Sequence, residues 1–268
     1  MPVIDHWVDN VRSLAHEAGL AIMAIYREPA QDALVATKSD DSPLTRADLA
    51  SHRIIVAGLA ALTPEIPVVS EEGEQSERTG LASARFWLID PLDGTKEFLA
   101  HNDEFTVNIA LIENGRPVFG VVDAPALGVT YWGGDGLGAW RESARKREPI
   151  RVAAWPAAGD PVRVVASKSH LNAETEAFIA KLGRHELVQA GSSLKFCRVA
   201  EGAADVYPRL APTCEWDTAA AQAVVEAAGG FVVQLDGSSL VYGKPEVLNP
   251  QFIALSLPLA QLPVGKSS

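Results

Sequence analysis

Residues 87–95 read Trp-Leu-Ile-Asp-Pro-Leu-Asp-Gly-Thr. The first three residues are apolar, as in a buried strand, and two carboxylates follow with only two residues between them. Asp90 and Asp93 can converge on one point only if the backbone turns between them, and Pro91 and Gly94 favour such a turn. Converging carboxylates repel each other, so they are stable chiefly with a cation between them. The segment therefore predicts a strand that ends at a divalent metal site, although Asp-Pro and Asp-Gly also occur in ordinary turns.

The composition bounds the class of protein. The chain has 268 residues, of which 47% are hydrophobic, so it holds enough apolar material for a sizeable core. Its formal net charge of -11 argues against non-specific binding to nucleic acid or to membrane surfaces. An anionic substrate remains compatible with this charge, because bound divalent cations invert the local field of an acidic site.

Cysteine use and hydropathy indicate the compartment. Cys197 and Cys214 are the only cysteines and lack CxxC spacing, which disfavours a disulfide scaffold or a zinc site and favours a cytoplasmic protein with reduced thiols. The N-terminus does not have the pattern of a secretory signal. No apolar run approaches ~18 residues, so we expect no transmembrane segment. We also expect no nucleic-acid partner.

The first half of the chain, residues 1–150, begins with two predicted helices. Apolar residues recur every three or four positions over residues 4–25, which predicts a core-facing helix that ends near Pro29. A second apolar helical face follows residues 42–45. The remainder predicts short strands, which together with the helices make an α+β domain; their ranges are 67–70, 85–90, 105–113, 117–123 and 130–132.

Two local signals organise the rest of the chain. Asn114-Gly115 predicts a hairpin turn between two of the strands. The charged residues 143–149 predict a surface turn or linker, after which residues 151–268 alternate between the two element types and predict an α/β domain. The strands are expected at 162–167, 187–190, 231–235 and 252–256, and the helices at 173–182, 192–201 and 218–228.

Three further acids stand beside short apolar segments. Glu71 follows Val68-Val69 at a strand end, where a carboxylate suits a hard cation, although a surface charge needs no such explanation. Asp48 lies in the first turn of the second helix, where it either interacts with the helix dipole or helps to orient and deprotonate a water. Asp217 opens an alanine-rich helix, where an acid is an ordinary cap. The bulky Trp216 beside it favours a carboxylate fixed at the tip of a closely packed helix.

Two polar segments could receive a phosphate. Residues 191–195, Gly-Ser-Ser-Leu-Lys, open a helix with backbone N–H groups, two hydroxyls and a lysine, and Ser192 and Lys195 are the candidate ligands. An ordinary serine cap with an exposed lysine explains the same residues equally well. Ser169 and His170 close a predicted strand and could face the same cleft, but a single histidine there is more often structural or solvated.

Three of these segments together resemble the signatures of the inositol monophosphatase superfamily: residues 70–72 (Ser-Glu-Glu), residues 87–95, and residues 216–220 (Trp-Asp-Thr-Ala-Ala). The resemblance implies a magnesium-dependent, lithium-inhibited phosphatase. It also implies a layered αβαβα sandwich, α+β in its first half and α/β in its second, with an antiparallel N-terminal sheet and a mixed C-terminal sheet. The N-terminal domain would carry most metal ligands, and the C-terminal domain would carry Asp217 and the nucleotide-binding residues.

Finer features resemble one branch of the superfamily. Residues 96–98 (Lys-Glu-Phe), 191–197 and 207–209 (Tyr-Pro-Arg) are similar to the bacterial 3′(2′),5′-bisphosphate nucleotidases of sulfur assimilation. This resemblance implies removal of the 3′-phosphate from 3′-phosphoadenosine 5′-phosphate to give AMP, and action on the 5′-phosphosulfate analogue. The alternatives are an inositol monophosphatase or sugar bisphosphatase of the same fold, and a non-catalytic nucleotide- or metal-binding module. A covalent aspartyl-phosphate mechanism of the D-x-D-G-T type does not fit, because two residues separate the acids.

The resemblance also implies site roles. Two or three Mg²⁺ ions would be held by Glu71, Asp90, Asp93, Asp217 and the carbonyl of Leu92. Thr95 and Asp48 would orient a metal-bound water and take its proton for in-line attack. The substrate would contact the metal ligands other than Asp90, the backbone of Gly94 and Thr95, and the side chains of Ser169, His170, Ser192 and Lys195. Left open are a monomer or a homodimer, the resting metal count, lithium sensitivity, and association with the cytoplasmic face of the inner membrane.

Overall fold

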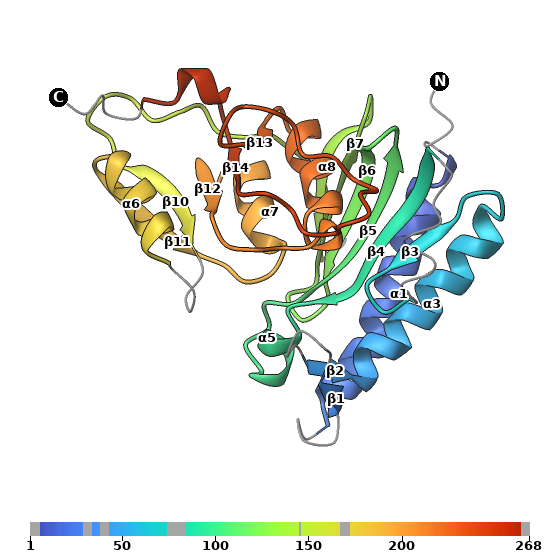
Figure 1. Cartoon of the computed structure of the whole chain (residues 1–268). Coiled ribbons are helices and arrows are strands. Elements are labelled where there is room, and N and C mark those ends of the chain that lie inside the picture. The colour runs from blue at the N-terminus through green and yellow to red at the C-terminus, as the bar shows by residue number, and fades with distance from the viewer. Residues whose placement is uncertain are drawn as a thin grey trace.

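The computed structural model describes residues 6–28, 34–37, 43–73, 84–144, 146–166 and 172–263. Within these residues the chain forms five layers, helix–sheet–helix–sheet–helix, as the resemblance implies (Figure 1). Helices α1 (Val8–Tyr26) and α3 (Arg46–Leu62) form the first layer, next to the short strand pair β1 (Leu34–Thr37) and β2 (Pro43–Thr45). Both predicted N-terminal helices are confirmed. Among the described residues, no helix combines the length and the apolarity that crossing a bilayer requires.

The second layer is a seven-stranded sheet in which only the first pair of strands is parallel. Its strands, in spatial and chain order, are β3 (Val68–Ser70), β4 (Arg85–Asp93), β5 (Thr106–Glu113), β6 (Arg116–Ala124), β7 (Val129–Gly134), β8 (Gly138–Ser143) and β9 (Lys146–Ile150). The predicted hairpin joins β5 to β6. Asn114 and Gly115 both have positive φ, 50° and 76°, which matches the twist of the flanking strands.

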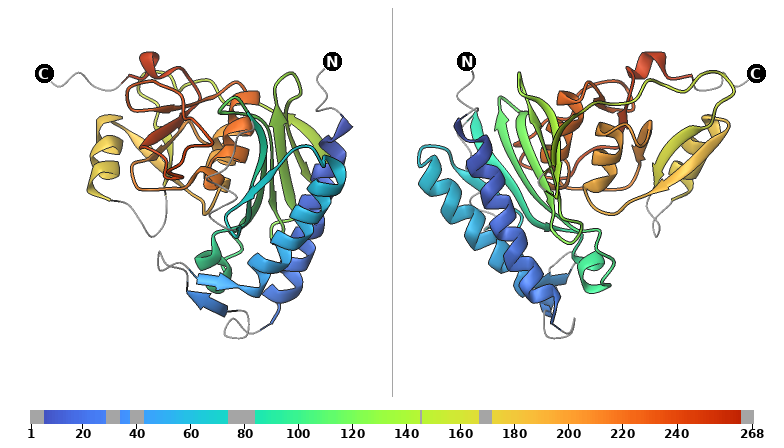
Figure 2. Two further views of the ribbon diagram at one scale, coloured as in Figure 1. Left: turned by 45° about the vertical axis from the view of Figure 1, so that its right-hand side comes forward. Right: turned by 180° about the vertical axis from the view of Figure 1, so that it is seen from behind.

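Alternation along β4 divides the apolar core between the two faces of this sheet. Trp87 and Ile89 pack with α1 and α3, whereas Phe86 and Leu88 pack with the helices between the sheets. Those helices are α7 (Leu194–Ala200) and α8 (Ala219–Ala227). Glycine on β6 and alanines on α8 allow the helix to approach the sheet closely. A Cβ on Gly120 of β6 would come within 2.1 Å of the Ala220 carbonyl oxygen. Figure 2 shows α1 and α3 on the sheet face opposite α7 and α8.

The outer layers come from the second half of the chain. The five-stranded sheet has the order β11-β10-β12-β14-β13 and mixes parallel and antiparallel pairs. Its strands are β10 (Val162–Ala166), β11 (His185–Gln189), β12 (Val206–Arg209), β13 (Phe231–Gln234) and β14 (Phe252–Leu255). Helix α6 (Ala173–Lys181) covers the outer face (Figure 1). Short elements complete the described fold: α5 (Thr95–Leu99), η2 (Glu215–Asp217) and η3 (Leu259–Gln261).

The prediction of a surface turn or linker at residues 143–149 is wrong. Residues 146–150 form β9, which pairs with β8 and closes one edge of the seven-stranded sheet. Charge misleads here because edge strands carry charged side chains that discourage pairing with other chains. The sequence also gives no prediction for β12, whose proline, Pro208, pairs with β14 alone because the pairing with β10 is confined to Val206. The domain boundary at residue 150 stays a prediction, since one apolar cluster contacts both sheets.

Candidate active site

Asp90 and Asp93 meet because β4 contains a β-bulge. Asp90 pairs with Asn108 and Asp93 with Thr106, so three steps along β4 oppose two along β5. In a regular strand, residues three apart point to opposite faces, and the extra residue brings both acids to one face. The predicted end of the strand at Asp90 is therefore wrong, because a bulge inside the hydrogen-bonded ladder brings the acids together. Pro91 is tolerated at such an irregular position.

Local hydrogen bonds hold the bulge in place. The N–H of Leu92 donates to Oδ1 of Asp90 at 3.0 Å. The hydroxyl of Ser51, which is fully buried on α3, donates to the carbonyl of Pro91 at 2.7 Å. Since α3 and the bulge are linked in this way, the helix packing also fixes the direction of the two carboxylates.

Asp217 completes a three-carboxylate cluster. Asp90, Asp93 and Asp217 each offer a ligand oxygen, and these oxygens lie within 4.8 Å of one another. Asp217 ends η2, where its Oδ2 accepts a 2.7 Å hydrogen bond from the N–H of Cys214. Glu71 follows β3, which runs parallel to β4, and its N–H donates to the carbonyl of Ile89 at 3.1 Å. The predicted metal ligands from three segments therefore gather at one end of the seven-stranded sheet.

The electrostatics of the cluster favour a cation. Burial, followed by the charges of Glu71, Asp93 and Asp217, raises the pKa of Asp90 well above its usual value. Burial, followed by the charge of Asp93, raises the pKa of Asp217 to about 8. Both shifts arise first because the carboxylates are removed from water, and then because they are held together with little compensating positive charge. Hard oxygen donors at this separation fit a divalent cation such as magnesium, and in the described part of the chain no other acid, histidine or cysteine group is so arranged.

Asp48 caps α3 with one carboxylate oxygen and faces Thr95 with the other. It is fully buried, and its Oδ2 accepts from the N–H of Thr45 at 2.8 Å and from the Thr45 hydroxyl at 2.5 Å, which closes a capping box on α3. Its other oxygen, Oδ1, lies 3.3 Å from the hydroxyl of Thr95. That hydroxyl lies at the same distance from the Leu92 carbonyl and can donate to either. The Thr95–Asp48 pair therefore connects the helix cap to the acidic cluster.

Two polar residues that the sequence reasoning missed support Asp93. Oδ2 of Asp93 accepts from the N–H of Ser193 at 2.7 Å, and it lies 2.8 Å from the Ser193 hydroxyl. The Ser193 hydroxyl is also 2.9 Å from the carbonyl of Asp217. The amide of Asn108 donates to both Ser193 Oγ at 2.8 Å and Asp93 Oδ2 at 3.3 Å. Ser193 thus links ligands from the two halves of the chain, and only the Gly-Ser-Ser run hinted at it.

The remaining predicted substrate residues lie beside this cluster or outside the described residues. Gly94 has φ 91°, and a Cβ there would come within 2.1 Å of the Ser192 hydroxyl oxygen, so the site requires glycine. Ser192 Oγ lies within hydrogen-bond distance of the carbonyls of Asp93 and Glu104, and its predicted phosphate contact stays a prediction. Ser169 and His170 lie outside the described residues.

A cationic patch shares the pocket with the acids. Lys195 of α7 is 9% exposed, and it lines one pocket with Asp93, Asp217, Tyr207 and Arg209. Burial lowers the pKa of Lys195, opposed chiefly by the charge of Asp93, and the charge of Arg209 lowers it further. The competing explanation of an exposed lysine after an ordinary serine cap does not hold, and the predicted lysine that faces an anion-binding cleft agrees with the position of Lys195. The sequence signals Arg209 only through the segment 207–209.

Replacing Ser193 with alanine should raise the metal concentration that gives half-maximal activity by roughly 10-fold, because groups that orient metal ligands typically contribute that much to affinity. The variant keeps the backbone N–H bond to Asp93 and loses only the hydroxyl. Ser256→Ala is the matched control, since the Ser256 hydroxyl is enclosed and has no hydrogen-bond partner among the described residues. Activity titrations with Mg²⁺ measure the effect. An unchanged metal requirement in Ser193→Ala would contradict the assigned role.

Known proteins resemble this chain in sequence and in fold. The inositol monophosphatase family matches residues 5–260. The 3′(2′),5′-bisphosphate nucleotidase CysQ of Salmonella typhimurium is 48% identical over 246 residues, which cover 91% of this chain and 98% of that protein. CysQ of Escherichia coli K12 is 47% identical over the same shares. The crystal structure of CysQ from Bacteroides thetaiotaomicron, described as a bacterial member of the inositol monophosphatase family, superposes with a TM-score of 0.81 at 42% identity and covers 95% of this chain and 98% of its own.

The sequence match spans nearly the whole chain, and the structural neighbour has the same layered fold. The resemblance that the three acidic segments indicated is therefore confirmed. These proteins are metal-dependent phosphatases, in agreement with the carboxylate cluster at the end of the seven-stranded sheet. The chain belongs to the inositol monophosphatase family.

Proposed function

We propose that this protein is a magnesium-dependent 3′(2′),5′-bisphosphate nucleotidase that converts 3′-phosphoadenosine 5′-phosphate to AMP and phosphate. One observation carries the choice of a bisphosphate: the pocket that contains Asp93 and Asp217 also contains Lys195 and Arg209. The acids suit a phosphate bound through cations, and the two basic side chains suit a second phosphate. A monophosphate substrate would leave the buried charge of Lys195 without an anionic partner from the ligand.

The residues divide the work as follows. Glu71, Asp90, Asp93 and Asp217 would hold the cations, with the carbonyl of Leu92 as a further ligand. When bound, magnesium supplies charge stabilisation for the phosphate and lowers the pKa of the attacking water. Thr95 and Asp48 orient that water, and the buried carboxylate of Asp48 takes its proton through the threonine hydroxyl. The backbone N–H groups of Gly94 and Thr95 bind the phosphate that is cleaved.

The other end of the substrate would lie toward α7 and β12. Lys195 and Arg209 bind the 5′-phosphate, and Ser192, Ser169 and His170 remain the candidate contacts to the rest of the nucleotide. This division predicts that the 5′-phosphosulfate analogue is also cleaved, because its 5′ end carries comparable charge. We also propose a cytoplasmic location, which the two free cysteines support.

A panel of substrates tests the proposal. With Mg²⁺ present, kcat/KM should be highest for 3′-phosphoadenosine 5′-phosphate and its sulfated analogue, and lower by at least ~10²-fold for inositol 1-phosphate, because two charged hydrogen bonds to the second phosphate contribute roughly 3 kcal/mol or more. Fructose 1,6-bisphosphate and added Li⁺ complete the panel. Released phosphate is the readout. A preference for inositol 1-phosphate would overturn the nucleotidase assignment.

Arg209→Gln serves as the internal control for this panel. It should raise KM for the bisphosphate nucleotide and leave the rate on inositol 1-phosphate nearly unchanged, because that substrate has no second phosphate. An equal loss of activity on both substrates would show that Arg209 does not bind the second phosphate.

A further inference from the structure

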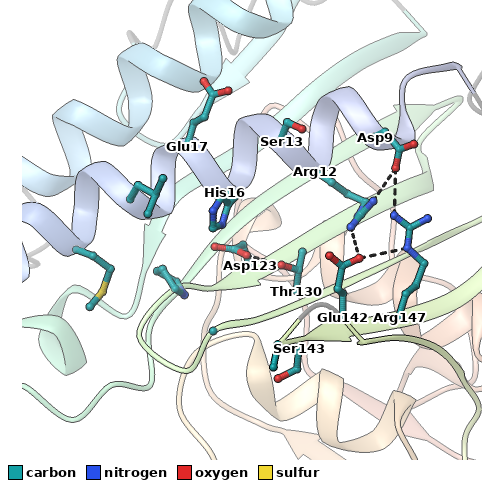
Figure 3. Close-up of a pocket in the computed structure, with 15 residues that line it drawn as sticks. Asp9, Arg12, Ser13, His16, Glu17, Asp123, Thr130, Glu142, Ser143 and Arg147 are labelled. Atoms are coloured by element: carbon teal, nitrogen blue, oxygen red, sulfur yellow. Dashed lines mark hydrogen bonds and ion pairs between the residues drawn. The ribbon is translucent and has the colours of Figure 1, made fainter.

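A second cleft lies on the opposite face of the seven-stranded sheet from α7 and α8. It has a volume of about 720 Å³ and runs between α1 and the strands β6 to β9. None of its lining residues belongs to the acidic cluster or to the cationic patch. Figure 3 shows charged side chains from α1 facing others from the strands across this cleft. The phosphatase site makes no use of it.

One end of the cleft is electrically balanced. Arg12 of α1 pairs with Asp9 at 2.6 Å and with Glu142 at 2.5 Å, and Arg147 of β9 reaches Glu142 at 3.2 Å and Asp9 at 3.4 Å (Figure 3). Both guanidinium groups also lie over the ring of Trp132, at 3.9 and 5.1 Å from its centroid. Two cations and two anions therefore neutralise each other, so this end holds no net charge for a ligand anion.

The other end is uncompensated. Asp123 of β6 is 2% exposed, and the Thr130 hydroxyl donates to its Oδ1 at 2.6 Å. Its Oδ2 has no hydrogen-bond partner among the described residues. Figure 3 places Asp123 beside His16, to one side of the ion-pair network. Glu17, the next residue along α1, is exposed and forms no ion pair within the described part of the chain. At this end the lining brings two carboxylates, those of Asp123 and Glu17, against one histidine, His16.

The geometry limits what could relieve this charge. A metal ion is disfavoured, because the described residues of this cleft hold no group of three acids, histidines or cysteines close enough to share one. An anion is disfavoured by the sign of the charge. A buried carboxylate oxygen instead requires an N–H donor. Beside it the cleft is apolar, with Leu20, Met23 and Pro125 in its lining and Leu20 58% exposed.

We propose that this cleft binds a small organic cation, a primary amine with a short hydrocarbon chain, whose ammonium group donates to Oδ2 of Asp123. Glu17 adds attraction for the charge, and Leu20, Met23 and Pro125 contact the hydrocarbon. Gly19 of α1 closes over the same oxygen, since a Cβ there would come within 2.7 Å of it. The approach of the ammonium group is therefore from the His16 side of the cleft.

Titration of the full chain with butylammonium chloride tests the proposal. Saturating Mg²⁺ is kept present so that the amine cannot occupy the acidic cluster, and backbone amide NMR shifts report binding. Saturable shifts are expected along α1 between residues 13 and 23. Asp123→Asn should weaken binding by about 10-fold or more, because a charged hydrogen bond is lost. The matched control Asp160→Asn, an exposed loop acid, should bind as the unchanged protein does.

Two further arms make the result decisive. Tetramethylammonium, which has the charge but no N–H donor, should bind at least as weakly as butylammonium binds to Asp123→Asn. Burial raises the pKa of Asp123 to about 6, opposed by the Thr130 hydrogen bond and the charge of His16, so binding should weaken as the pH falls below that value. Absence of saturable shifts, or equal affinity in Asp123→Asn, would overturn the proposal. Glu17→Gln, which changes an exposed side chain and so is safe for folding, should weaken binding less than Asp123→Asn.

Discussion

Replacing Asp93 with asparagine is expected to lower kcat by at least ~10²-fold and to raise the Mg²⁺ requirement, because an anionic ligand is lost where charge must be stabilised. The substituted side chain keeps the size of the original and one carbonyl oxygen. If the amide NH₂ of the asparagine takes the place of Asp93 Oδ2, the hydrogen bond from the Ser193 N–H is lost. If the amide oxygen takes that place, the hydrogen bond is kept. Initial rates at a series of Mg²⁺ concentrations, with calorimetric titration of the metal, measure both effects.

The matched control for this change is Asp135→Asn. Asp135 lies in the turn between β7 and β8 and forms an exposed ion pair with Arg116 at 3.5 Å, which contributes little to stability. It should leave kcat and metal affinity unchanged. If Asp93→Asn retained full activity with an ordinary Mg²⁺ requirement, the carboxylate cluster would not be the metal site.

Replacing Asp48 with asparagine should lower kcat by roughly 10²- to 10⁴-fold, the usual range for loss of a general base. An asparagine still fills the buried space and can accept from the N–H of Thr45, but it cannot take a proton from the Thr95 hydroxyl. Metal affinity should be unchanged, because Asp48 is not a ligand. Single-turnover rates at saturating Mg²⁺ and substrate are the measurement.

Asp48 also caps α3, so stability must be separated from catalysis. Thr45→Ala removes the same cap from its other side and should cost about 1 kcal/mol of unfolding free energy, measured by denaturant titration, while most of the activity remains. If Thr45→Ala lost activity as severely as Asp48→Asn, the effect of Asp48 would be structural, and the proton would need another acceptor.

The sequence predicts the metal ligands because each of them directly follows or precedes an apolar segment. Asp90 and Asp93 follow a buried run, Glu71 follows a short strand, and Asp217 precedes a helix, so local pattern makes them candidates and the family resemblance selects them. The alternation of apolar periods predicts an α+β half followed by an α/β half, and the resemblance to a known family adds the αβαβα layering. A family resemblance then joins segments that are far apart in the chain.

Ser193 and Asn108 show why the remainder could not be predicted. Ser193 matters because it meets Asp93 across the interface between the two halves, 100 positions away, and Asn108 matters because it meets Asp93 from the neighbouring strand β5. Nothing within a few residues of either one signals that contact. The prediction for residues 143–149 is wrong for a different reason. Charge alone does not distinguish a loop from an edge strand, and this segment is a strand because β9 pairs with β8.

The bulge in β4 ties the spacing of the acids to the packing of the core. An insertion or deletion between Asp90 and Asp93 would not simply lengthen a loop. It would slip the ladder against β5, turning Trp87 and Ile89 away from α1 and α3 if the acids kept their place. The spacing between Asp90 and Asp93 therefore cannot change without a change in the register of β4 against β5. A chain that keeps this core intact keeps the two carboxylates at a fixed separation.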